Sequence, residues 1–209
     1  MVLRLSVGLA ITAVLNSVVA CNHTESPITL AISRCDSAGC VSAGVKGSLY
    51  GLQQPTANSC WATVLTMLFS WKEQRRENTD SLLKRFGNKF VQLYRQSATR
   101  GIGISDEIEL YQKAGLTIMR QLDPSIEGWA EFIRNFGPLS LTVDASPPFG
   151  GTVHAILIVG IRGKTDGSNT TLYYIDPQDG ELHTTPFMTF LKMYEAKFAV
   201  DWPIQIIHF

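Results

Sequence analysis

The chain has 209 residues, of which 45% are hydrophobic, and its 18 Lys and Arg residues balance 18 Asp and Glu residues. This length suits one domain, alone or with a leader, and is enough to bury a substantial core. Balanced charge without a basic tract gives no indication of nucleic-acid binding or of attraction to an acidic membrane surface. We therefore expect an ordinary globular protein, and we expect it to be a monomer.

The first 20 residues differ from the rest of the chain. Residues 1–20 contain a single charge, Arg4, followed by the apolar run LSVGLAITAVLNSVVA. This composition predicts a secretory signal peptide, and the segment is short for a membrane span. A buried first helix would normally show a polar face, whereas this segment has only scattered Ser, Thr and Asn. We expect an exported protein, secreted or held in the cell envelope.

Cys21 follows the leader directly. The run LNSVVAC resembles the lipobox of bacterial lipoproteins, in which this cysteine receives a lipid after cleavage. Such a lipid would attach the protein to a membrane. An ordinary signal-peptide cleavage after Ala20 explains the same residues without a lipid, so both interpretations stay open.

The remaining cysteines divide into a pair and a single thiol. Cys35 and Cys40 lie in the loop-like run SRCDSAGCVSAG, and an oxidising compartment favours a local disulfide between them. Unbridged thiols in a flexible loop are the alternative, since disulfide geometry cannot be read from sequence. With a lipid on Cys21, Cys60 is left free. No histidine pair lies near these cysteines, so we expect no zinc site.

The first half of the chain predicts an arm followed by helices. Residues 21–50 contain Pro27 and many Ser and Gly, which favours an extended arm or tether. A helix broadly apolar around its circumference begins near Asn58 or Ser59, either of which has the chemistry of an N-cap, and it should run through the core. Further helices are expected from Asp80 or Ser81 to Tyr94, from Ser105 to Gly115, and from Ser125 to Gly137.

After Pro138 the pattern changes to β-branched and alternating residues. The predicted strands are LSLTV, VHAILIVGI and TLYYID, with shorter segments near ELHTT, KFAV and IQIIHF. The DPQDG run predicts a tight turn, and Thr185 and Pro186 predict the start of a short helix. Helices first and strands afterwards indicate an α+β domain over residues 51–209.

Cys60 is the candidate nucleophile because it lies at the start of the predicted core helix, where a helix N-terminus stabilises negative charge on sulfur. A cysteine nucleophile needs a base, and the base needs an acceptor that orients it. Among the 4 histidines, only His154 begins a strong apolar strand, although it would also suit an ordinary core histidine. Asp176 ends the next strand, where it also suits a turn, and a hairpin can bring its carboxylate beside His154.

Gln54 precedes Cys60 by six residues in the run QPTANSCWA. Its side-chain amide can join the Cys60 backbone N–H in an oxyanion hole, which stabilises the tetrahedral intermediate of acyl transfer. Gln53 is the near rival for this role.

Gln54 and Cys60 in QPTANSCWA, the segment GPLSLTVDA, His154 in VHAILIVGI and Asp176 in YYIDPQDG carry a family resemblance. From about residue 51 to 209 the chain resembles the papain-like cysteine proteases, most closely the compact bacterial branch that includes secreted effector proteases of plant pathogens. The resemblance implies a two-lobed fold, in which a helical lobe with a central Cys-bearing helix packs on a twisted antiparallel β-sheet.

The resemblance also implies roles for single residues. Cys60 is the nucleophile, His154 the base and acid, Asp176 the orienting residue and Gln54 the oxyanion donor. No metal or organic cofactor is required, and the partner is a protein or peptide substrate. Plant and lysosomal members usually have Asn where this chain has Asp176, whereas the bacterial branch uses Asp. Asn58-Ser59 replaces the glycine-serine pair of papain, so papain's substrate preference does not transfer to this chain.

Other functions compete with peptide hydrolysis. An acyltransferase of the transglutaminase or arylamine acetyltransferase type keeps Cys, His and Asp in the same order, but the glutamine before Cys60 argues against it. A peptidoglycan peptide hydrolase suits an exported bacterial chain, although the sequence has no wall-binding repeat. A non-catalytic binding module on the same fold is the third alternative, because fold alone does not establish activity.

Overall fold

The computed structural model describes residues 26–35, 37–120, 125–144, 153–196 and 202–209. Within these ranges the chain forms six helices and seven strands. The helices are α1 Cys60–Lys72, α2 Thr79–Phe86, α3 Asn88–Arg95, α4 Ile104–Lys113, α5 Ile126–Phe136 and α6 Phe187–Ala196. The strands are β1 Cys40–Gly44, β2 Thr117–Met119, β3 Leu139–Asp144, β4 Val153–Lys164, β5 Thr171–Ile175, β6 Leu182–Pro186 and β7 Ile206–His208.

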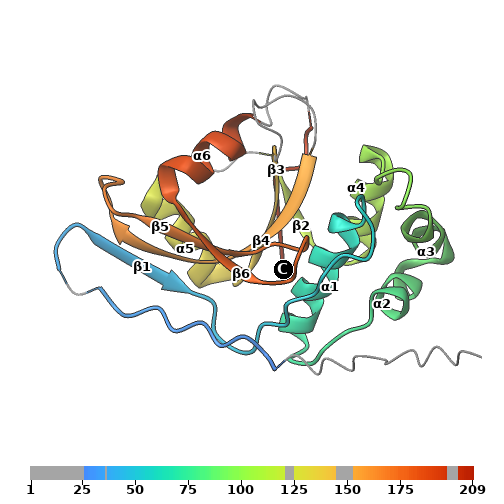
Figure 1. Cartoon of the computed structure of the whole chain (residues 1–209), viewed down its shortest axis with the longest axis horizontal. Helices are drawn as coiled ribbons and strands as arrows, with labels where there is room; N and C mark the ends of the chain where they lie inside the picture. The colour runs from blue at the N-terminus through green and yellow to red at the C-terminus, as the bar shows by residue number, and fades with distance from the viewer. Residues whose placement is uncertain (1–25, 36, 121–124, 145–152, 197–201) are drawn as a thin grey trace, which may run out of the picture.

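The strands form one antiparallel sheet with the order β2-β7-β3-β4-β5-β6, and β1 also pairs with β4. The long strand β4 is the centre of this arrangement. Its first half pairs with β3, and its second half lies between β5 on one edge and β1 on the other. β1 therefore continues the edge of β4 where β3 ends, as the ribbon in Figure 1 also shows.

α1 is the core helix of the fold. Its residues from Trp61 to Ser70 are all buried, and it packs against β4 and β3. The hydroxyls of Thr66 and Ser70 donate to the carbonyl oxygens four residues earlier, at 2.7 Å each, so these two buried hydroxyls are satisfied. In Figure 1, α1 to α4 gather at one side of the molecule, while α5 and α6 cover the sheet at the other.

Several sequence predictions are confirmed. The domain is α+β with an antiparallel sheet, and all the strands predicted after Pro138 that fall within the described residues are present. Ser125 caps α5, because its hydroxyl accepts from the Gly128 N–H at 3.1 Å. α5 ends at Phe136, and its C-cap is Gly137, whose φ of 80° suits glycine. The predicted KFAV segment, the leader and Cys21 lie outside the described residues.

Other predictions are wrong. The helix expected to run unbroken to Tyr94 is two helices, α2 and α3, because Gly87 between them has a φ of 136° that no helix accepts. The segment Cys40–Gly44, expected to be part of an irregular arm, is strand β1. Strand β2 has no counterpart among the predicted strands. Residues 40–44 of the expected arm therefore belong to the sheet.

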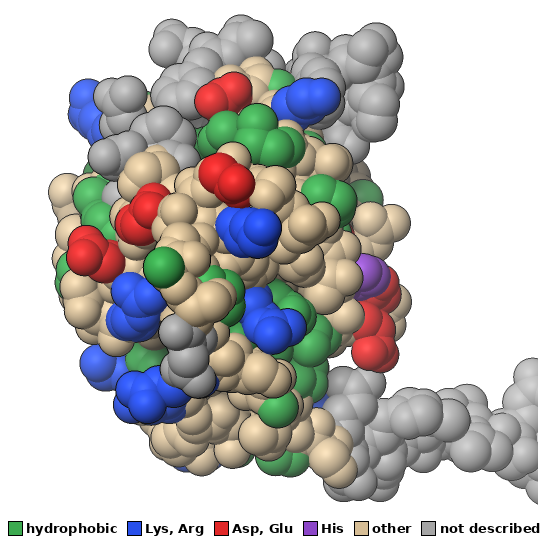
Figure 2. Space-filling model, turned by 90° about the vertical axis from the view of Figure 1, so that its left-hand side faces the viewer, with side chains coloured by type: hydrophobic (Ala, Val, Ile, Leu, Met, Phe, Trp, Pro, Cys, Tyr) green, Lys and Arg blue, Asp and Glu red, His purple; other side chains and the backbone are tan. Residues whose placement is uncertain are grey.

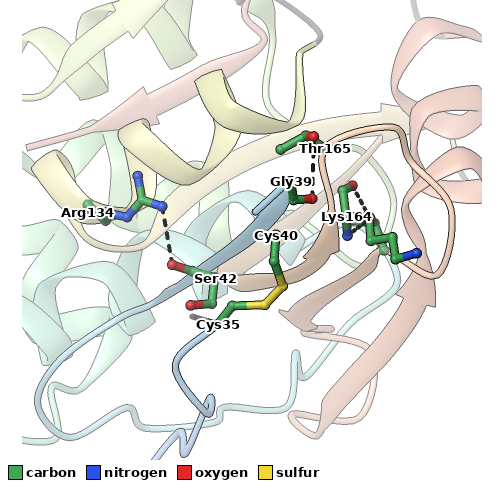
Figure 3. The surroundings of a disulfide bond; sticks show 8 residues. Cys35, Gly39, Cys40, Ser42, Arg134, Lys164 and Thr165 are labelled. Atoms are coloured by element: carbon green, nitrogen blue, oxygen red, sulfur yellow. Dashed lines mark hydrogen bonds between the residues drawn. A yellow bond between two sulfur atoms is a disulfide. The ribbon is translucent and has the colours of Figure 1, made fainter. Parts of the chain in front are cut away.

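The disulfide between Cys35 and Cys40 is present, with 5.7 Å between the two Cα atoms. It closes the turn that leads into β1, beside the hairpin that follows β4 (Figure 3). The prediction of this pair is confirmed. None of the helices in the described ranges has both the length and the apolar character that crossing a membrane requires.

Candidate active site

Cys60 is the first residue of α1 and a free thiol with intermediate exposure. The predicted side-chain cap is wrong, because no side chain caps this helix. Instead, the Ser59 hydroxyl donates to Thr56 O at 2.8 Å and accepts from Thr56 N at 3.2 Å. These two bonds hold Ser59 against Thr56, and they thereby position the residue that directly precedes Cys60.

His154 and Asp176 come from neighbouring strands. His154 is the second residue of β4, opposite Val143 of β3, and Asp176 directly follows β5. The imidazole Nε2 lies 2.8 Å from Asp176 Oδ1, and the two side chains are 15% and 21% exposed. Asp176 Oδ1 also accepts from the Gln178 N–H at 2.8 Å. Asp176 therefore starts the turn and contacts the histidine at the same time.

The surroundings of His154 favour its charged form. Burial by itself lowers the pKa of His154, but hydrogen bonds to Asp176 and Cys60 and the attraction of their charges outweigh it and raise the pKa from 6.5 to about 9. Burial by itself raises the pKa of Asp176, yet the hydrogen bonds from His154 and from the Gln178 N–H bring it below its usual value. Since Nε2 is engaged by Asp176, Nδ1 is the ring nitrogen left for Cys60.

Cys60 and His154 both line one cleft of about 670 Å³. Gln54 lines the same cleft, while Asp176 lies behind the histidine and does not line it. The structure thus brings the thiol, the imidazole and the glutamine together, with the carboxylate supporting the imidazole. Within the described ranges, no group of three or more His, Cys, Asp or Glu side chains is placed to bind a metal ion.

This arrangement of a thiol, an imidazole and a carboxylate agrees with the comparison with known families. Residues 46–195 match the family model Peptidase_C70, described as papain-like cysteine protease AvrRpt2. The chain belongs to this papain-like protease family. No curated protein matches the chain significantly. Membership supports cysteine protease activity at the level of the family, with proteins or peptides as substrates.

The matched range of this papain-like protease contains all the residues of the predicted site. Gln54 is oriented by its own loop, because its Nε2 donates to Thr56 O at 2.8 Å and to Ala57 O at 3.1 Å. The Gln54 backbone N–H donates to Pro177 O at 2.6 Å. Gln53, the near rival, does not line the cleft, and its Nε2 donates to Gln178 O at 3.2 Å.

The segment before Gln54 also touches the turn after Asp176 through two glycines. A Cβ on Gly51 would lie 2.0 Å from Gly180 O, and a Cβ on Gly180 would lie 2.9 Å from Gln53 N. Gly180 has a φ of 79° as well. Only glycine allows these backbones to approach so closely. We call residues 51–54 and 176–180 the glycine clasp, which ties the loop that leads to Cys60 to the turn that holds Asp176.

Sequence reasoning missed the glycine clasp and most of the cleft walls. Ile102, Glu107, Thr142 and Trp202 line the cleft but come from four separate segments. Glu107 is buried in α4, and its Oε1 accepts from the Tyr111 hydroxyl at 2.8 Å. Burial, the Glu107 carboxylate and Cys60 raise the pKa of Tyr111 well above its usual value, so Tyr111 stays a neutral donor. No local sequence signal links these residues to Cys60.

Proposed function

We propose that the chain is an exported cysteine peptidase that hydrolyses peptide bonds. Cys60 is the nucleophile, His154 the acid and base, Asp176 the residue that orients the imidazole, and Gln54 a donor to the oxyanion. The observation that best supports this proposal is the contact of 2.8 Å between His154 Nε2 and Asp176 Oδ1, beside a free thiol that lines the same cleft as the imidazole.

In the first half of the reaction, the Cys60 sulfur attacks the carbonyl carbon of the scissile peptide bond. The negative oxygen of the tetrahedral intermediate accepts from the Cys60 N–H and from Gln54 Nε2. The amide gives up its longer hydrogen bond, to Ala57 O at 3.1 Å, to make this contact. The intermediate collapses as the C–N bond breaks, and the His154 imidazolium protonates the leaving amine.

In the second half, the neutral imidazole takes a proton from a water molecule, which attacks the carbonyl carbon of the thioester. A second tetrahedral intermediate forms and is stabilised by the same donors. The C–S bond then breaks, the carboxylic acid leaves, and Cys60 and His154 return to their starting charges. Asp176 stays ionised throughout, because its hydrogen bonds keep its pKa below the usual value.

The cleft also offers polar atoms to a substrate. Gln54 Oε1 and Trp202 Nε1 are buried at its wall and have no hydrogen-bond partner among the described residues. A peptide lying across the cleft can donate a backbone N–H to the first atom and accept from the second with a carbonyl. These contacts would hold the substrate in the cleft that Cys60 lines.

The proposal extends to the organisation of the whole chain. Residues 1–20 are a signal peptide, and Cys21 is either the new N-terminus or the site of a lipid that attaches the protein to a membrane. The peptidase domain, residues 51–209 joined by β1, is a monomer with a helical lobe and a β-rich lobe on either side of the cleft. The Cys35–Cys40 disulfide supports export, since disulfides persist in oxidising compartments.

The test is cleavage of casein, with the new N-termini identified by mass spectrometry. The wild-type protein should cleave it, whereas Cys60→Ala and His154→Ala variants with unchanged circular dichroism should cleave it at least about a hundredfold more slowly. The same reaction with a primary amine added separates hydrolysis from acyl transfer, and isolated peptidoglycan peptides test for a wall hydrolase. If wild-type protein leaves every substrate intact and does not react with an iodoacetamide probe at Cys60, the chain is a binding module and the proposal is wrong.

A further inference from the structure

A second hollow lies away from the active-site cleft and shares no lining residue with it. This groove of about 610 Å³ is bounded by the segment before β1, by β1 itself and by the C-terminal ends of α1 and α5. We call it the β1 groove. None of its residues takes part in the proposed catalysis, so any function it has stands apart from peptide hydrolysis.

Basic side chains line the β1 groove, and acidic side chains do not. Arg34, Lys46, Lys72 and Arg134 all line it, and no Asp or Glu of the described residues does so. None of these four makes an ion pair with a carboxylate in the described part of the chain, whereas Lys89 pairs with both Asp106 and Glu109 at 2.6 Å. On the side of the molecule that carries β1, the lower part shows several Lys and Arg side chains and has Asp and Glu only at the right-hand edge, whereas the upper part shows charges of both signs (Figure 2).

Helix ends explain only part of this charge. Lys72 and Arg134 lie in the last turns of α1 and α5, where the helix dipole favours cations. Arg34 and Lys46 lie outside any helix, and Trp71 Nε1 donates to Lys46 O at 2.7 Å and fixes the backbone of Lys46 at the groove. Helix dipoles therefore account for Lys72 and Arg134 but not for Arg34 and Lys46.

The groove also contains the outer edge of β1. Gly39 O accepts from Thr165 N and Val45 N donates to Val159 O, both at 2.9 Å, so these residues face β4. By the alternation of a strand, the backbone groups of Ser42 and Gly44 face away from β4. Ser42 O confirms this direction, because it accepts from Arg134 Nη2 at 3.2 Å (Figure 3). No other strand of the described ranges pairs with this edge.

Aromatic rings form the apolar part of the groove. Trp71, Phe136 and Phe209 line it, and Lys72 Nζ lies 4.7 Å from the centre of the Phe209 ring. The groove thus combines three features: a strand edge that no other described strand pairs with, cations without a described carboxylate partner, and apolar walls. An anionic membrane or a nucleic acid could neutralise the cations, but neither has backbone N–H and C=O groups that pair with a strand edge. An extended peptide has them.

We propose that the β1 groove binds an acidic peptide segment of a partner protein. The segment lies extended along the outer edge of β1 and pairs with the backbone of Ser42 and Gly44, as in other cases of strand addition. Its carboxylates contact Arg34 and Lys46, and Arg134 exchanges the Ser42 carbonyl for a carboxylate, which makes a stronger, charge-assisted bond. Alternate apolar side chains pack on Trp71 and Phe136.

The test uses the full chain with Cys60→Ala, so that the probe is not cleaved. The probe is a fluorescein-labelled peptide of alternating Glu and Val, and binding is followed by fluorescence anisotropy at low and at physiological salt. We expect saturable binding that weakens with salt, since surface charge interactions are screened. Adding Lys46→Gln and Arg134→Gln should raise the Kd at least tenfold. The control, Lys84→Gln with Lys192→Gln, changes charge equally on exposed positions outside the groove and should leave the Kd unchanged.

Two further probes separate charge from strand pairing. The same peptide with alternate amides N-methylated keeps its carboxylates but loses its backbone donors, and a peptide of alternating Gln and Val keeps its backbone but loses its charge. Each should bind at least tenfold more weakly. The proposal is wrong if the groove variant and its control bind alike, if N-methylation has no effect, or if only phosphatidylserine vesicles or an oligonucleotide bind.

Discussion

The active-site cleft and the β1 groove differ in where their charges are balanced. In the cleft, the cationic form of His154 is matched within the protein by Asp176, and both groups are mostly buried. In the β1 groove, Arg34 and Lys46 have no described carboxylate as partner. A preorganised charge pair serves chemistry, because it costs no rearrangement when the substrate reacts. Unpaired surface cations instead suit recognition, because a ligand must supply the opposite charge.

The two hollows also differ in how they are built. The cleft depends on the glycine clasp, which joins segments more than a hundred residues apart in the sequence. The β1 groove depends on β1 and on the disulfide that precedes it. Changes at one hollow should therefore leave the other intact, and this independence can be tested by mutation.

The largest expected effect is loss of the nucleophile. Cys60→Ala should lower kcat/KM for peptide cleavage by more than about a thousandfold, because no other group can form the acyl intermediate. His154→Ala should lower it by about 10²–10⁴-fold, the usual contribution of a general acid and base. Both variants should bind the acidic probe at the β1 groove with the wild-type Kd. Cleavage at the wild-type rate in either variant would exclude the proposed mechanism.

Gly51→Ala should break the glycine clasp. The new Cβ would lie 2.0 Å from Gly180 O, so the loop that leads to Gln54 and Cys60 must shift. A displacement of about 1 Å between catalytic groups can cost about 10²-fold in rate, so kcat should fall by up to this amount while KM changes less. Steady-state cleavage kinetics on the purified variant measure both constants.

The control for the glycine clasp is Gly103→Ala, at the start of α4. A Cβ there meets no atom closer than 3.8 Å, and Gly103 lines neither hollow. This variant should keep wild-type kinetics. Equal rates for Gly51→Ala and Gly103→Ala would show that the clasp does not position the catalytic groups.

Asp176→Asn should change the pH dependence of cleavage. The wild-type imidazole keeps its proton until the pH passes its pKa of about 9, and above that value the acid that protonates the leaving amine is lost. Removing the neighbouring negative charge lowers the pKa of His154. The alkaline limb of the kcat/KM profile should therefore move to lower pH by at least about one unit.

The side-chain amide that Asp176→Asn introduces can still accept from the imidazole. The rate at neutral pH should therefore fall only about tenfold, which corresponds to about 1.4 kcal/mol. A pH profile identical to that of the wild type would mean that Asp176 does not set the charge of His154.

The smallest effect on catalysis is expected from the disulfide. Replacing Cys35 and Cys40 by Ser removes a cross-link between residues 5 apart, and chain entropy then predicts a loss of about 2 kcal/mol in the free energy of unfolding. Urea unfolding measures this loss. Cleavage should be unchanged, whereas binding of the acidic probe should weaken because β1 and Arg34 are held less firmly. Loss of cleavage with normal probe binding would contradict the expectation that the disulfide supports the β1 groove and not the active-site cleft.

The sequence predicts the regular parts of the fold well. β3 to β7 are rich in β-branched residues, and α5 has both a serine cap and a terminating glycine. β1 escapes prediction because CVSAG has little β-propensity of its own and forms a strand through its pairing with β4. The break at Gly87 escapes prediction because the apolar spacing of α2 continues into α3, so periodicity outweighs a single glycine.

For the candidate site, residue order is enough to predict that His154 and Asp176 lie together, because the hairpin between β4 and β5 is local, and the structure shows this contact. The glycine clasp could not be predicted from the sequence. Gly51 and Gly180 are ordinary loop glycines in the sequence, and their contact exists only in the folded chain. The Ser59 hydroxyl could either cap α1 or bond to the preceding turn, and the sequence does not decide between them. In the structure it bonds to Thr56.

The central claim is that His154 activates the thiol of Cys60. Its most direct test is the rate of alkylation by iodoacetamide at about pH 7, followed by mass spectrometry of the peptide that contains Cys60. The wild-type thiol should react at least tenfold faster than the thiol of the His154→Ala variant, because the imidazolium stabilises the thiolate. Equal rates in the two folded proteins would contradict the account.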